Sequence, residues 1–229
     1  MSANQTYVEI QNNVLSLISK SDATTRNRIK NWINMGYYDF VLRELWPFRE
    51  TTGTLSTVAS TQEYSLASNF TDIDAQNIVS VAVQGAPQGK LVYWPFNQLR
   101  ADQPDFDFEG AGIPTRYYIK SGQIGFWPLP ADVYTVLIDY YKVPTELSAD
   151  SDAPIVPVAY REALVQYALS LEHDFNTDAD LAQKAMNRYE QIVTLARNNL
   201  LAQPTDTESF RILGPADARS WSGLPGEVR

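Results

Sequence analysis

Hydrophobic and polar residues follow a helical period at both ends of the chain and a strand-like pattern in the middle. Between residues 7 and 18, apolar side chains recur every three or four positions, and Thr6 followed by Glu9 matches a capping box at a helix start. A second, longer apolar face begins near residue 24 and runs to Trp46, where Pro47 would stop a helix. The first segment is therefore predicted to be a pair of helices.

The middle of the chain carries short runs of β-branched and aromatic residues, separated by Gly, Pro, Asn and Asp. These runs lie at 51–57, 63–66, 78–83, 90–94, 116–120, 123–127 and 133–141. They predict a compact antiparallel sheet or a small barrel. Residues 101–112 are acidic and carry no such run, so we expect a surface loop there.

Helical periodicity returns after a linker at 143–156. One apolar stripe runs from Tyr160 to Phe175, and Thr177 with Asp180 is predicted to cap a further helix. Two helix pairs with one apolar face each bury these faces most simply against one another. We predict an α+β fold in which N- and C-terminal helix pairs form a four-helix bundle, with an inserted antiparallel β domain and an extended C-terminal arm. The predicted boundaries are 1–47, 48–147, 148–202 and 203–229.

The C-terminal segment 203–229 has a composition of its own. Its prolines and glycines exclude a long helix, yet it carries large apolar residues, including Phe210 and Trp221, that are too few to build a core. Two interpretations stay open. The segment either packs back on its own chain or is an arm that docks on another subunit.

Composition narrows the class of protein. The chain has 229 residues, no cysteine and a single histidine, His173. This length suffices for a substantial core, and the lack of cysteine excludes disulfides, thiolate metal sites and thiol nucleophiles. No run reaches the roughly 20 apolar residues of a membrane-spanning helix, and residues 1–12 lack a signal-peptide pattern. We expect a soluble intracellular protein.

The charge argues against nucleic-acid binding. The formal net charge is −9, and the acidic residues are spread over the middle of the chain without forming an acidic tail. Proteins that grip DNA neutralise phosphates with clustered Lys and Arg. No specific DNA binding is therefore predicted.

One stretch imitates a calcium-binding loop. Asp105, Asp107, Glu109 and Gly110 have the spacing of its first ligands, but its twelfth position is Arg116, where the loop requires a glutamate. The pattern fails at its most important ligand. No metal site is predicted from it.

Catalytic motifs are missing from the sequence. His173 has no second histidine, and its neighbours Glu172 and Asp174 point to different sides of a helix. We predict that His173 is a solvated residue near a helix C-terminus. The chain shows neither a Gly-rich phosphate loop nor a GxSxG elbow, and nothing selects one carboxylate pair from the many acids. Neither an enzyme nor a cofactor is predicted.

Aromatic residues make up 12% of the chain. Most are explained by core packing, and the remainder are candidate interface anchors, because aromatic side chains concentrate binding energy in buried patches. The candidates for a tail or subunit interface are Trp94, Phe96, Phe126 and Trp127.

The order of several aromatic and turn motifs resembles the head-to-tail adaptor proteins of tailed bacteriophages, including the tail-tubular adaptors of short-tailed phages. The resemblance covers roughly residues 6–200 and rests on the order of the motifs more than on any one of them. The motifs are YYDF at 37–40, WPF at 46–48, GIPTRYY at 112–118, GFWPLP at 125–130 and VLIDYYKVP at 136–144.

The resemblance implies a ring, typically of twelve copies, beneath the portal protein at the capsid vertex. Such a ring connects the capsid to the next tail component, a nozzle or tail protein, and continues the channel for genome ejection. DNA would pass its bore without specific binding, and assembly would take place in the bacterial cytoplasm without a membrane. In this family a C-terminal segment commonly reaches the portal. The matching candidates here are Phe210, Arg211, Ile212, Leu213 and Trp221.

Two other functions are kept as alternatives. The first is a carbohydrate-binding or carbohydrate-active virion module that stacks sugars on Trp94 and Trp127, with Asp105 and Asp107 as nearby acids. The second is another tail-completion or fibre-attachment protein, which differs from an adaptor chiefly in its partner.

Overall fold

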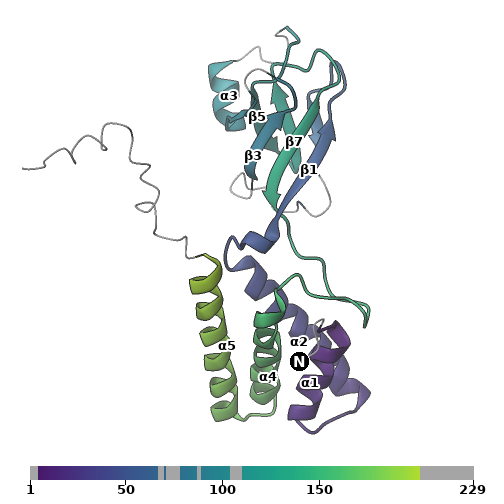
Figure 1. The fold of residues 1–229 in the computed structure, drawn as a ribbon, viewed down its shortest axis with the longest axis vertical. Helices are drawn as coiled ribbons and strands as arrows, with labels where there is room; N and C mark the ends of the chain where they lie inside the picture. Colours follow the sequence, from purple (N-terminus) through teal and green to yellow (C-terminus); the bar gives the residue numbers. More distant parts are fainter. Residues whose placement is uncertain (1–4, 67–69, 71–77, 87–88, 104–109, 202–229) are drawn as a thin grey trace, which may run out of the picture.

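The computed structural model describes residues 5–66, 70, 78–86, 89–103 and 110–201. Within them the fold is α+β, with five α helices and two sheets. Figure 1 shows the helices from the two chain ends gathered at one end of the molecule and the sheets, with α3, at the other. The helices of the first group are α1 (Tyr7–Leu17), α2 (Ala23–Leu42), α4 (Glu162–Phe175) and α5 (Ala179–Leu200).

The two predicted helix pairs are confirmed, and all four helices contribute to one hydrophobic cluster. α4 is the most deeply buried of them, because Leu164 and Ala168 on one face and Val165 beside them are all at most 1% exposed. It packs against α1, α2 and α5. The capping box is confirmed as well, since the Glu9 carboxylate accepts the Thr6 N–H at 2.8 Å.

The prediction that α2 continues to Trp46 is wrong, because the helix ends at Leu42. The Arg49 guanidinium donates to the carbonyls of Val41 (3.2 Å) and Glu44 (3.0 Å), so it satisfies acceptors that the end of a helix leaves open. The indole of Trp46 is fully buried and donates to the Phe40 carbonyl at 2.8 Å. Pro47 starts a short 3-10 helix, η1 (Pro47–Arg49).

The break between α4 and α5 differs from its predicted form. Thr177 does not cap α5; it has a left-handed backbone with φ of 65°, and Asp178 is the N-cap residue. A 3-10 turn, η3 (Val158–Tyr160), precedes α4. The buried Arg161 holds this approach by donating to the carbonyls of Val156 (2.8 Å) and Pro154 (2.8 Å).

The β region contains two sheets with a common core. One has the order β1 (Glu50–Ser56), β7 (Thr135–Tyr141), β3 (Ile78–Val83), and the other has the order β2 (Glu63–Ser65), β6 (Gln123–Trp127), β5 (Arg116–Lys120), β4 (Val92–Tyr93). In the first sheet Ile138 of β7 lies opposite Gly53 on one side and Val81 on the other. Buried residues of both sheets, among them Val81, Phe126 and Ile138, form one hydrophobic cluster.

Two details of the β region correct the predicted antiparallel domain. β4 pairs with β5 in parallel, so the second sheet is mixed. The predicted surface loop begins too early, because residues 101 and 102 belong to α3 (Phe96–Asp102), a short helix that the sequence analysis missed. Residues 104–109 of that loop lie outside the described residues.

Candidate functional site

Three of the four predicted interface aromatics, Trp94, Phe96 and Trp127, meet around α3 on one side of the second sheet. Trp94, Leu99 and Tyr118 form a small buried cluster, against which Phe96 and Trp127 pack with part of their surface exposed. The two tryptophan rings meet edge to face with centroids 5.6 Å apart. The sequence therefore named residues that are close in space, although it gave no reason for their proximity.

Cations cover this aromatic cluster. The Arg116 guanidinium carbon lies 3.8 Å from the ring centroid of Trp94 and 5.5 Å from that of Trp127. Lys120 lies 4.9 Å from the Phe96 ring, and its ammonium pairs with Glu63 at 2.8 Å. The contacts of Arg116 with the two tryptophans are cation–π interactions between its guanidinium group and the indole rings. Arg116, which breaks the calcium-loop pattern, thus has a packing role in the strand.

Burial divides the four interface candidates. Phe126 is 0% exposed and belongs to the core between the sheets, and Trp94 is 9% exposed. Phe96 and Trp127 are half-buried and keep exposed surface. An interface through this cluster would therefore rest on Phe96 and Trp127, and it stays a prediction.

A small cavity of about 180 Å³ lies near the β4 edge of the second sheet, with a mainly apolar lining. Leu91, Ile113 and Pro114 are among the residues that line it, and Ile113 is 44% exposed. This volume is below the 300 Å³ or so of ordinary ligand pockets.

The structure brings together no metal site in the part of the chain that it describes, where no three His, Asp or Glu side chains group closely enough to hold an ion. Three of the calcium-loop residues, Asp105, Asp107 and Glu109, lie outside the described residues. His173 is half-buried in the last turn of α4, so the predicted position at a helix C-terminus is confirmed, while the side chain is less solvated than predicted. None of the described helices has the length and apolar composition to cross a membrane.

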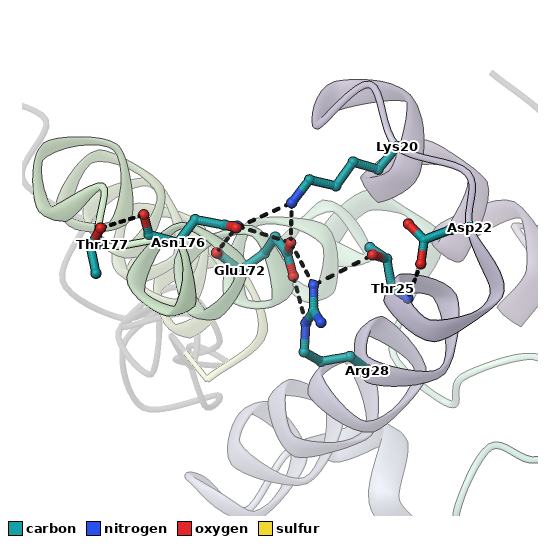
Figure 2. A network of polar contacts seen from close by, with 7 residues as sticks. All are labelled: Lys20, Asp22, Thr25, Arg28, Glu172, Asn176 and Thr177. Carbon is teal, nitrogen blue, oxygen red and sulfur yellow. Dashed lines mark hydrogen bonds and ion pairs between the residues drawn. The ribbon is translucent and has the colours of Figure 1, made fainter.

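Glu172, which precedes His173 in the sequence, carries a buried charge in the helical region (Figure 2). The Glu172 side chain is 0% exposed, and its contacts join α4 to α2 and to the turn that precedes α2. Arg28 donates to both carboxylate oxygens at 3.0 and 2.9 Å, Lys20 donates at 3.2 Å, and the Asn176 amide donates at 2.9 Å. Sequence analysis placed Glu172 on a separate face from its neighbours and did not foresee that this face is internal.

The environment of Glu172 keeps it ionised. Burial by itself would raise its pKa, but the hydrogen bonds from Arg28, Asn176 and Lys20, together with the positive charge of Arg28, outweigh burial and lower the pKa. A general acid needs a raised pKa instead. The saturated set of donors thus marks Glu172 as a structural link between helices.

Other perturbed carboxylates in the described residues show the same direction. The pKa of Asp22 is lowered by the Thr25 N–H at the start of α2, and that of Asp139 by the hydroxyls of Thr52 and Ser80. The Ser148 and Ala149 amides lower the pKa of Asp152. Each of these carboxylates accepts hydrogen bonds that organise a cap, a strand pair or a turn.

An exposed face of α2 escaped the sequence analysis. Met35 is 52% exposed, Leu42 is 44% exposed and Leu45 beyond the helix is 47% exposed, with the half-buried Tyr38 between them. Their spacing of three, four and three residues is the signal that would have revealed them as one stripe.

The predicted portal contacts Phe210, Arg211, Ile212, Leu213 and Trp221 lie outside the described residues.

Comparison with known proteins identifies the family. No curated protein matches the chain. The family model described as SU10 adaptor protein matches residues 5–217, which include both helix pairs and the whole β region. The predicted resemblance to phage head-to-tail adaptors is thereby confirmed, and the chain belongs to the SU10 adaptor protein family.

Proposed function

We propose that this phage structural adaptor joins the portal protein to the next tail component as a non-enzymatic ring, with twelve as the expected copy number. The observation that carries the proposal is its membership of an adaptor family over nearly the whole chain. Packing of α1, α2, α4 and α5 around one core supports a rigid four-helix bundle as the ring-forming unit. The C-terminal arm 203–229 would reach the portal.

The charge of the chain supports passage of DNA through such a ring. Each copy carries a formal net charge of −9, so a ring of copies has a strongly negative field. A negative wall repels phosphates and offers no fixed cations for them to bind. The genome would slide through this channel during ejection without specific contacts.

Deletion of the C-terminal arm tests the portal contact. A chain ending at residue 202 keeps every described helix and strand, so we expect its far-ultraviolet circular dichroism to show an intact fold. It should no longer associate with purified portal in a co-sedimentation assay. Undiminished binding by the truncated chain would show that the arm is not the portal contact.

Full-length variants separate the side chains from the mere length of the arm. Replacing Phe210, Ile212 and Leu213 by alanine should abolish portal binding as the deletion does. Replacing Ser220 and Ser222, which flank Trp221, by alanine is the matched control and should leave binding unchanged. Equal binding by both variants would argue against apolar anchoring.

The carbohydrate alternative gains no support from the geometry. Sugar stacking needs an open aromatic face, but Trp94 is 9% exposed with Arg116 over its ring, and the half-buried Trp127 packs against Trp94 and Arg116. The tail-completion and fibre-attachment alternative differs from an adaptor chiefly in its partner. Binding to portal, as opposed to binding only to a fibre protein, separates the two.

A further inference from the structure

The outward side of α2 forms an uncharged stripe along the helix. Its residues recur every three or four positions and change from polar to apolar toward the C-terminus: Thr24, Asn27, Asn31, Met35, Tyr38 and Leu42. All are exposed except Tyr38, which is half-buried. At 1.5 Å per residue the stripe is about 27 Å long. We call this surface the α2 stripe.

Arg28, Lys30 and Asp39 lie three or four residues from stripe positions and therefore border the α2 stripe, whereas Arg26 lies on another side of the helix. Arg26 donates to Asn12 at 3.0 Å, Arg28 binds Glu172, and Lys30 pairs with Asp150 at 3.4 Å. Asp39 pairs with Arg43 at 2.8 Å. The three charged residues that border the α2 stripe are therefore all ion-paired within their own chain.

The α5 helix provides the contrast. Its exposed positions mix charged residues, Lys184, Arg188 and Glu190, with two exposed leucines, Leu181 and Leu195. The α2 stripe instead has the composition of an interface core, where charge is depleted and Met and Tyr are enriched. Its exposed apolar side chains need a partner to cover them.

We propose that the α2 stripe is the surface through which one copy of this chain packs against a second copy. Two copies of a chain with a net charge of −9 repel each other, so their contact is favoured where neither presents charge. The α2 stripe offers such a surface over the full length of a long helix. This inference rests on the proposed function, because a ring brings identical copies side by side.

Substitutions that add one negative charge test the contact. Met35→Glu and Leu42→Glu each place a carboxylate in the α2 stripe, and both positions are exposed enough for the fold to tolerate the change. Val133→Glu is the matched control, since Val133 is an apolar residue that is 65% exposed in the β region. Circular dichroism verifies that all three variants are folded.

Self-association is then measured by sedimentation velocity over a concentration series, with the full chain alone and with purified portal. The wild-type protein and Val133→Glu should associate equally. Met35→Glu and Leu42→Glu should associate about a hundredfold more weakly, because like charges would face a desolvated apolar surface. A wild-type chain that never self-associates in either setting overturns the proposal, as does normal association of both stripe variants.

The cysteine-free sequence permits a second, independent test. In Met35→Cys the new thiol is the only one in the chain, so a thiol-reactive photocrosslinker can be attached there alone. Mixing isotopically light and heavy protein distinguishes links between copies from links within one. Links between copies from position 35, absent for Val133→Cys, support the proposal. Links from position 35 to portal or tail components instead would overturn it while leaving the adaptor function intact.

Discussion

At the residue scale, a few buried polar side chains link neighbouring elements of the protein. Glu172 is fully buried but ionised, because three donors from two segments surround it. A buried charge that loses its partners is strongly destabilising, since nothing replaces the lost hydration. Such a residue therefore fixes how α4 lies on α2, and replacing it should be costly.

We expect Glu172→Gln to lower the free energy of unfolding by about 3 kcal/mol, because Arg28 and Lys20 would keep their positive charge with no carboxylate between them. Glu190→Gln is the control. Glu190 also binds an arginine, Arg43, through both oxygens, but it is 50% exposed, so its loss should cost only about 0.5 kcal/mol. Urea denaturation measures both, and equal effects would refute the role of burial.

Comparison of the wild-type protein with Glu172→Gln also gives a prediction about the pH dependence of stability. Folding lowers the pKa of Glu172 below its ordinary value of 4.5, so the unfolded chain binds the proton more readily. The stabilisation is complete above that value and is lost as pH falls through the lower pKa of the folded state. The stability difference between wild type and Glu172→Gln should be constant near neutral pH and shrink below about pH 4.5, as measured by thermal denaturation in a pH series.

At the element scale, periodicity identified what long segments become. The helices around Ile10, Ile33, Leu164 and Ile192 follow from apolar residues three and four positions apart, and the strands of the β region largely coincide with the predicted runs. The end of α2 could not be predicted in this way. It depends on Arg49, a residue beyond the helix whose side chain returns to cap it.

Short elements and surfaces escaped prediction for similar reasons. α3 spans less than two full turns with Leu99 as its buried residue, so it has too few positions to show a period. The parallel pairing of β4 with β5 is a long-range contact that no local pattern encodes. Aromatic content singled out Trp94 and Phe126 as interface candidates, but it does not distinguish a buried ring from an exposed one.

The packing of β5 on β6 gives a prediction at this scale. A Cβ atom at Gly125 would lie 2.1 Å from the ring of Tyr118 on the neighbouring strand. We expect Gly125→Ala to lower the free energy of unfolding by about 2 kcal/mol, because the ring would have to leave its buried position. Gly110→Ala meets no atom within 4 Å and should be neutral. Urea denaturation of both variants checks this, and a neutral Gly125→Ala would show that the sheet adapts.

At the scale of the whole molecule, two hydrophobic cores are joined where the chain crosses between them twice. One core lies among the helices and the other between the sheets. The outgoing crossing is η1 and the returning one follows β7. Arg49 connects both, since its side chain donates to Val41 and Glu44 on the helical side and to the Lys142 carbonyl, at 3.2 Å, on the β side. Arg49 is therefore a polar link between the helical and the β end of the molecule.

We expect Arg49→Met to uncouple the two ends of the molecule. The methionine keeps the apolar stem but removes every donor, which leaves three carbonyl groups without their charged partner and costs about 2–3 kcal/mol. Hydrogen exchange resolved by peptide, followed in a urea series, should show that α2 and α4 lose protection at a different urea concentration from β1 and β7. In the wild-type protein the two ends should lose protection together.

Arg161→Met distinguishes uncoupling from general loss of stability. Arg161 is 6% exposed against 2% for Arg49 and also donates to three carbonyls, those of Gln5, Pro154 and Val156, but all three lie on the helical side. Its loss should therefore lower the stability of the protein without separating the transitions of its two ends. If Arg49→Met shifted both ends equally, as Arg161→Met should, the two cores would be coupled by the chain crossings themselves and Arg49 would act only as a helix cap.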